Sequence, residues 1–145
     1  MKRLMLVGET GAGKRSLIRA LSGGELPSRL PMSVEFHGSF INTPGEFLEN
    51  RRFYCRLITA AADCDIVAFV QDATRRASLF PPLFASSFNR KLVGVISKTD
   101  AEEADPERAD RLLRNAGAKD ILRVSARTGE GLKTLRTLLA SGPFV

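Results

Sequence analysis

The sequence predicts an α/β fold in which a mostly parallel sheet is covered by helices on both faces. Three unbroken apolar runs, at 4–7, 66–70 and 92–96, do not alternate with polar residues. This pattern is typical of parallel strands that are buried on both faces. A weaker run at 121–124 adds a fourth strand, and helical periodicities lie between the runs. The alternation predicts a three-layer α/β sandwich, formed as a single domain over residues 1–145.

Helices are predicted where apolar residues recur at helical spacing. The third predicted helix begins after Asp105, with Pro106 in its first turn, and ends at Gly117. The apolar positions of the four helices are Leu17, Ile18 and Leu21; Tyr54, Leu57, Ile58 and Ala61; Leu112 and Leu113; and Leu132, Leu135, Leu138 and Leu139. Residues 24–50 break the alternation, and we expect two short strands there, at 33–36 and 39–41, joined by loops.

The composition excludes several classes of protein. The chain is 43% hydrophobic and has no apolar run near the roughly 18 residues that a membrane helix needs. The net charge of +6 is dispersed along the chain and forms no known nucleic-acid motif, so we expect no nucleic-acid and no membrane partner. Cys55 and Cys64 are interpreted as half-buried free thiols of a cytoplasmic protein, and His37 as a solvated loop residue.

A glycine-rich segment, GETGAGK at 8–14, joins the first strand to the first helix. Glycines let the backbone curl so that successive N–H groups point at a phosphate, and Lys14 adds a full positive charge. The next residue is usually a serine or threonine that binds Mg²⁺, but here it is Arg15. Ser16 follows, about 100° further around the helix. The predicted phosphate-binding residues are Gly8, Gly11, Ala12, Gly13, Lys14, Arg15, Ser16 and Gly45.

Two later segments resemble base-recognition elements of GTPases, the first that of the Ras-like class and the second that of the translation-factor class. SKTD at 97–100 follows the third apolar strand, and SARTGEGL at 125–132 follows the fourth. A carboxylate at Asp100 can accept two hydrogen bonds from guanine, whereas adenine offers no such pair of donors. Ser97 replaces the commoner asparagine. The predicted base-binding residues are Lys98, Asp100, Ser125 and Ala126, at the carboxyl ends of strands where open α/β sheets bind ligands.

The metal-associated positions depart from the usual pattern. NTPGE at 42–46 resembles the D-T-P-G-E form of the switch II element of GTPases. Asn42 stands in place of an aspartate whose carboxylate holds Mg²⁺ through water. Glu46 takes the place of a water-positioning glutamine and is the one candidate catalytic residue. Pro31 takes the place of a metal-binding threonine. Either an unused metal site has drifted, or the guanidinium of Arg15 replaces the metal as a phosphate partner. We therefore name no metal ligand.

These segments together resemble the EutP/PduV family, small P-loop GTPase-like proteins of ethanolamine and propanediol utilisation. The resemblance also includes 43–51 and 62–67 and spans essentially the whole chain. It implies a Ras-like six-stranded sheet of order 2-3-1-4-5-6, with strand 2 antiparallel. It also implies a cytoplasmic or microcompartment-associated location, with shell or enzyme proteins as partners. Family members have been assigned an ATP-dependent acetate kinase activity.

Three function classes remain open. The chain is a guanine-nucleotide-binding protein with weak or absent hydrolysis, an ATP-dependent acetate kinase, or a pseudo-GTPase that serves in protein contacts or shell targeting. Asp100 favours GTP and GDP over ATP, because adenine cannot satisfy its carboxylate. Arg15, Pro31 and Asn42 argue against Mg²⁺ and favour the third class, since both reactions use Mg²⁺ to offset phosphate charge.

Overall fold

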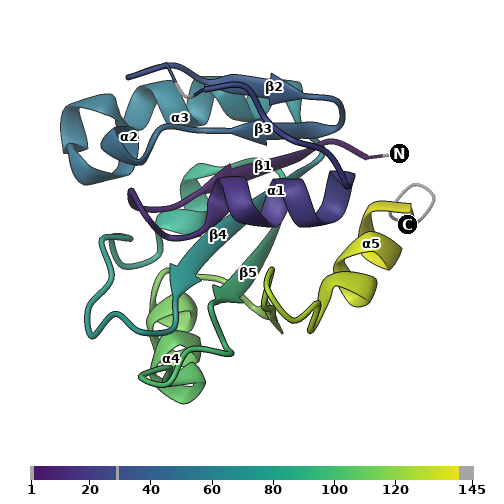
Figure 1. Cartoon of the computed structure of the whole chain (residues 1–145). Coiled ribbons are helices and arrows are strands. Elements are labelled where there is room, and N and C mark those ends of the chain that lie inside the picture. Colours follow the sequence, from purple (N-terminus) through teal and green to yellow (C-terminus); the bar gives the residue numbers. More distant parts are fainter. Residues whose placement is uncertain (1, 29, 141–145) are drawn as a thin grey trace.

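A computed structural model describes residues 2–28 and 30–140. Met1, Arg29 and residues 141–145, which fall within the predicted domain, lie outside the described residues. The described chain forms one sheet of six strands in the order β2-β3-β1-β4-β5-β6 (Figure 1). The strands are β1 (Leu4–Val7), β2 (Glu35–His37), β3 (Phe40–Asn42), β4 (Ile66–Asp72), β5 (Lys91–Ser97) and β6 (Asp120–Arg123).

The order and direction of the strands match what the family resemblance implies. β2 pairs with β3 antiparallel, and every other neighbouring pair is parallel. The predicted fold class, a Ras-like, mostly parallel α/β sheet, is therefore confirmed. The helices are α1 (Lys14–Ser22), α2 (Gly45–Glu49), α3 (Tyr54–Ala60), α4 (Pro106–Asn115) and α5 (Leu132–Ala140), with short 3-10 turns η1 (Arg51–Phe53), η2 (Ala61–Asp63) and η3 (Phe84–Ser87).

The central strands divide their side chains between two cores. Met5 and Val7 of β1 lie in one buried cluster with α2, α3 and α4, whereas Leu4 and Leu6 lie in the other with α1 and α5. Successive side chains of a strand point to opposite faces, so a strand covered on both sides must be apolar at every position. This is why the runs that predicted the strands do not alternate.

Two parts of the chain differ from the sequence prediction, the pair of short strands and the segment that follows them. The short strands begin two and one residues later than expected, so His37 lies in β2 with its side chain 14% exposed, and its interpretation as a solvated loop residue was wrong. The five-residue helix α2 was not predicted. It is anchored by the buried side chains of Phe47 and Leu48, which is a tertiary cause that no local periodicity reveals.

The crossover from β4 to β5 contains the 3-10 turn η3 and a cluster of phenylalanines. The ring of Phe69 on β4 stacks on Phe80 at 4.5 Å between centroids, and Phe84 and Phe88 lie 5.8 and 5.6 Å from it. Aromatic packing of this kind adds to the free energy that burial of the rings supplies. The sheet is thus covered here by side chains of an irregular segment.

The two cysteine thiols differ in their exposure. Cys55 is exposed, whereas Cys64 is buried, and its burial raises the pKa of the thiol to about 11. The prediction of two half-buried thiols was therefore wrong in detail.

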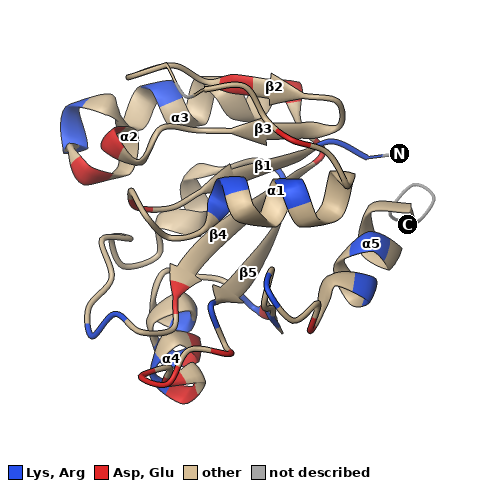
Figure 2. Cartoon of the chain, in the orientation of Figure 1, with Lys and Arg blue, Asp and Glu red and all other residues tan. Residues whose placement is uncertain are grey.

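Lys and Arg side chains are spread over several elements and are interleaved with acidic residues on α4 (Figure 2). Among the described residues, no helix combines the length and hydrophobicity needed to cross a bilayer.

Candidate functional site

The glycine-rich segment curls between the end of β1 and the start of α1. Gly13 precedes the helix with a φ of 99°, a left-handed conformation that other residues adopt at a cost. The loop also lies against the start of α2, because a Cβ on Gly45 would come within 2.2 Å of the Thr10 nitrogen. Only glycine fits at position 45, so the phosphate loop and the segment after β3 are held in direct contact.

The lysine of this loop is folded onto its backbone. Lys14 is 7% exposed, and its ammonium donates hydrogen bonds to the carbonyls of Gly8 at 2.6 Å and Glu9 at 3.0 Å. The loop therefore positions a buried positive charge at the N-terminal end of α1, where backbone N–H groups also favour an anion.

Arg15 reaches across to the strand β2. Its Nη1 lies 2.5 Å from Oε2 of Glu35, and its Nη2 donates to the carbonyl of Pro27. The other oxygen of Glu35 accepts a hydrogen bond of 3.0 Å from Nδ2 of Asn42, and Nε2 of His37 lies 3.7 Å from Oε2. Burial alone would raise the pKa of Glu35, but the hydrogen bonds from Arg15 and Asn42 outweigh it, so this pKa is lowered.

The predicted base-recognition residues come together from two loops. Ser125, which is fully buried, donates its hydroxyl hydrogen to Oδ1 of Asp100 at 2.7 Å. The ammonium of Lys98 donates to the carbonyl of Gly11 at 2.6 Å and lies 3.0 Å from Oδ2 of Asp72. Lys98 thus connects the loop after β5 to the phosphate loop.

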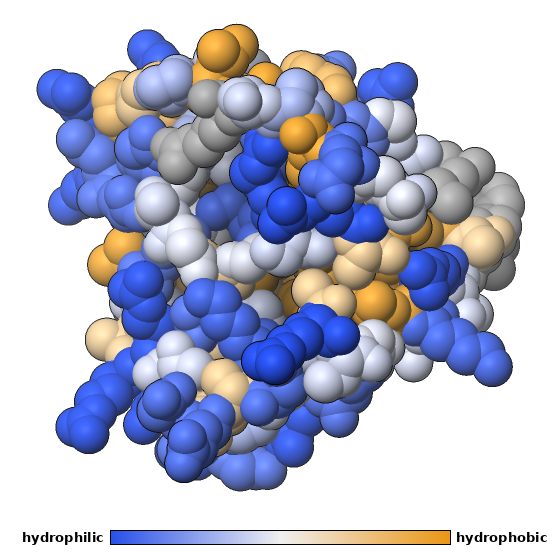
Figure 3. Space-filling view, in the orientation of Figure 1, coloured by the Kyte–Doolittle hydropathy of each residue, from blue (hydrophilic) through white to orange (hydrophobic). Residues whose placement is uncertain are grey.

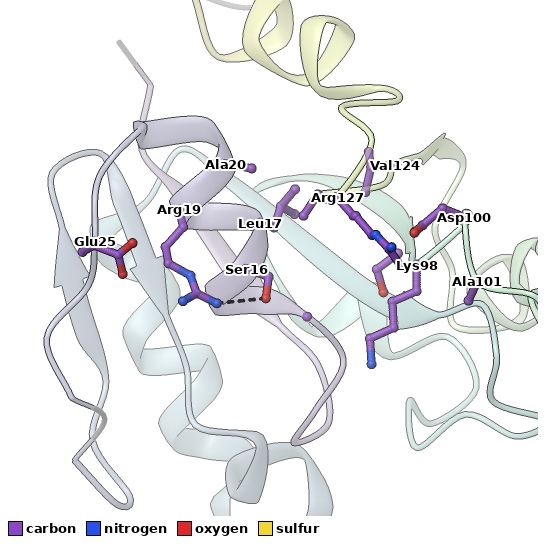
Figure 4. Close-up of a pocket in the computed structure, with 13 residues that line it drawn as sticks. Ser16, Leu17, Arg19, Ala20, Glu25, Lys98, Asp100, Ala101, Val124 and Arg127 are labelled. Carbon is purple, nitrogen blue, oxygen red and sulfur yellow. Dashed lines mark hydrogen bonds between the residues drawn. The ribbon is translucent and has the colours of Figure 1, made fainter.

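Two adjoining cavities lie along these residues. The larger, of about 630 Å³, is lined by Leu17 and Ala20 of α1 and by Asp100 and Ala126 on the opposite side. Asp100, Lys98 and Arg127 face α1 across it (Figure 4), and hydrophobic surface lies between α1 and α5 on the same side of the molecule (Figure 3). We call this the base cavity.

The second cavity, of about 250 Å³, lies over the phosphate loop, and we call it the phosphate cavity. Lys14, Arg15, Glu35, Asn42 and Gly45 are among its lining residues. The two cavities share Gly13, Ser16 and Lys98. They therefore adjoin one another, in an order of chemical groups that suits a base joined to phosphates.

The remaining predicted residues differ in their position relative to the two cavities. Glu46 is in the first turn of α2 and is not among the described residues that line either cavity. Pro31 is exposed, whereas Ser33, two residues later, lines the phosphate cavity. The hydroxyl of Ser16 accepts a hydrogen bond of 3.3 Å from Arg19 (Figure 4). Gly8 is buried beneath the loop, where a Cβ would lie 2.8 Å from the carbonyl of Val70.

Sequence reasoning missed two carboxylates of the site. Glu35 lies among short strands without any motif, and its role is visible only once β2 is placed beside Arg15. Asp72, with its side chain 3% exposed, ends β4 and holds Lys98. Burial would raise the pKa of Asp72, but hydrogen bonds from Thr74 and Lys98 lower it. Its place at the carboxyl end of an apolar strand was the available signal.

Comparison with known proteins identifies the family to which this geometry belongs. The PduV-EutP family, described as ethanolamine utilisation - propanediol utilisation, matches residues 1–141. The chain belongs to this family. The resemblance seen in the sequence is therefore confirmed over nearly all of the chain.

Individual relatives agree with this assignment. The propanediol utilization protein PduV of Citrobacter freundii is 36% identical over 135 residues, covering 91% of this chain and 89% of the relative. A protein of Escherichia coli K12 named "Probable acetate kinase EutP" is 34% identical, covering 97% and 91%. The tRNA modification GTPase MnmE of Methylibium petroleiphilum is 29% identical over 94% of this chain and 33% of its own length. The family is thus distantly related to P-loop GTPases.

Proposed function

We propose that this protein binds guanine nucleotides in ethanolamine- or propanediol-type microcompartment metabolism, with weak or absent hydrolysis. The observation that carries the proposal is that the two cavities adjoin at Gly13, Ser16 and Lys98. One end offers a carboxylate at Asp100, and the other offers the ammonium of Lys14. Family membership supports the metabolic setting, and the distant relation to a GTPase supports the ligand class.

A second candidate function is acetate kinase activity with ATP, which the printed name of the Escherichia coli relative favours. Asp100 argues against it here. Its Oδ1 is fixed by the hydroxyl of Ser125, so the carboxylate faces the base cavity as an acceptor for which adenine has no matching pair of donors. A pseudo-GTPase acting only through protein contacts is the remaining class.

Calorimetric titration with GDP, GTP, ADP and ATP separates these functions. We expect GDP to bind more tightly than ADP by at least about 2 kcal/mol, because the wrong base leaves a polar group of the site without its partner. Equal affinity for the two diphosphates would overturn guanine selectivity and favour the kinase. Absence of binding by all four nucleotides would favour the protein-contact function.

The residues at the metal position fit Mg²⁺ poorly. Arg15 stands where a hydroxyl is usual, Asn42 is neutral, and both oxygens of Glu35 already accept hydrogen bonds from these two residues. We infer that nucleotide binding here does not rely on the metal, so hydrolysis lacks the charge neutralisation that P-loop GTPases use.

Nucleotide affinity is accordingly expected to change less than tenfold between excess EDTA and millimolar Mg²⁺. The guanidinium of Arg15 stands where a metal ligand is usual, and Glu35, the carboxylate that could otherwise attract a divalent ion, is already paired with Arg15. The double variant Arg15→Thr with Asn42→Asp removes the cation and leaves two carboxylates together, so it should bind the nucleotide more tightly with Mg²⁺. A tenfold gain with Mg²⁺ in the unmodified protein would contradict the inference.

A further inference from the structure

Glu35 introduces a negative charge into a cavity that otherwise suits phosphates. Of the described residues that line the phosphate cavity, it is the only acidic one. Lys14, Arg15 and Lys98 supply positive charge to the same cavity. An ionised carboxylate repels a bound anion unless a cation neutralises the carboxylate. The presence of Glu35 in this cavity therefore calls for an explanation.

The carboxylate is held firmly in this position. The Glu35 side chain is 10% exposed, with Oε2 on the guanidinium of Arg15 and Oε1 on the amide of Asn42. Turning the carboxylate out of the cavity would break both interactions. Because the hydrogen bonds lower its pKa, the group is ionised at neutral pH.

The charges at this end of the cavity cancel. In a P-loop GTPase of the usual form, a divalent ion and one carboxylate leave a surplus of positive charge facing the terminal phosphates. Here Arg15 and Glu35 form a pair of opposite unit charges, and Asn42 is neutral. Lys14, at the curled loop, remains as the cation for the phosphates nearest the loop.

We propose that Glu35 makes the phosphate cavity selective for nucleoside diphosphates over triphosphates. The inference rests on the proposed nucleotide-binding function and specifies its ligand. The loop from Gly11 to Lys14 serves the first two phosphates. A third phosphate would extend toward Asn42 and Gly45. There it would be repelled by the carboxylate of Glu35, and the guanidinium of Arg15 is already paired with that carboxylate.

The test compares GDP and GTP by calorimetry in excess EDTA, for the unmodified protein and for Glu35→Gln. Glutamine has the same shape and retains an oxygen that accepts hydrogen bonds, so the strand β2 should keep its place. We expect GDP to bind at least tenfold more tightly than GTP in the unmodified protein. In Glu35→Gln the ratio should fall below threefold, chiefly through tighter binding of GTP.

Two further variants sharpen the result. Arg15→Gln leaves Glu35 without its cation, so the preference for GDP should increase, which is the opposite of the change in Glu35→Gln. Glu107→Gln is the matched control, because Glu107 is exposed on α4 and pairs with Arg123 outside both cavities. This control should leave the ratio unchanged, and thermal melting should show that each variant is folded.

Other outcomes would overturn the inference. Equal affinities for GDP and GTP in the unmodified protein, or an unchanged ratio in Glu35→Gln, would show that Glu35 does not select the phosphate number. If millimolar Mg²⁺ tightens GTP binding and Glu35→Gln removes that gain, Glu35 is a metal ligand instead. Failure of both nucleotides to bind the unmodified protein would overturn the proposed function itself, which is a different result.

Discussion

Replacing Lys14 with alanine is expected to weaken nucleotide binding at least a hundredfold while leaving the fold intact. Lys14 is buried at the floor of the phosphate cavity, and a charged hydrogen bond to a phosphate contributes about 1.5–3 kcal/mol. The upper part of this range matches the roughly 2.7 kcal/mol that a hundredfold loss represents. Calorimetry with GDP measures the loss.

The variant also removes two internal hydrogen bonds, to Gly8 and Glu9, so its stability must be measured beside its affinity. We expect a lower melting temperature but a cooperative transition, since neutral backbone partners contribute only about 1 kcal/mol each. Lys91→Ala is the matched control. Lys91 is at the start of β5, pairs with the exposed Asp120 and lines neither cavity. Unchanged GDP affinity in Lys14→Ala would mean that the glycine-rich loop is no phosphate site.

The second large effect is expected at Asp100. In Asp100→Ala the affinity for GDP should fall at least about thirtyfold, or about 2 kcal/mol, while the affinity for ADP changes less than threefold. The carboxylate lines the base cavity, and the hydroxyl of Ser125 already holds its Oδ1, which reduces the side-chain ordering that guanine binding requires. Titration of the variant with both diphosphates measures the change in selectivity.

Two companion variants locate the effect. Ser125→Ala removes the hydroxyl that orients Asp100 and should produce a smaller loss of GDP affinity in the same direction. Glu102→Ala removes the same charge from an exposed loop position two residues away and should leave both affinities unchanged. An equal loss for GDP and ADP in Asp100→Ala would show that this residue supports the loop but does not read the base.

Much of the fold could be predicted because its causes are local. A strand that is covered on both faces must be apolar throughout, so β1, β4 and β5 stand out in the sequence. The glycines of the phosphate loop are required by backbone conformation and close approach, as at Gly13 and Gly45. A motif that depends on such constraints keeps its spacing and can be recognised.

The remaining features depend on contacts between distant residues. The helix α2 is too short for a periodic pattern and is stabilised by burial of Phe47 and Leu48. The phenylalanines of the β4–β5 crossover are recognised as core residues only when the fold places them against Phe69 of β4. Glu35 becomes part of the candidate site because the fold brings β2 within reach of the Arg15 side chain, and no residue near Glu35 in the sequence indicates that placement.

The position of Lys98 has a consequence for how a ligand is recognised. This side chain lines both cavities, and its ammonium is shared between the phosphate loop at Gly11 and the end of β4 at Asp72. A group that binds in one cavity therefore changes the position of Lys98, which also lines the other cavity. Thermodynamic linkage makes such an effect reciprocal, so a nucleoside and a pyrophosphate would change each other's affinity by the same factor. A nucleotide, which carries both parts on one molecule, would then be bound as a unit.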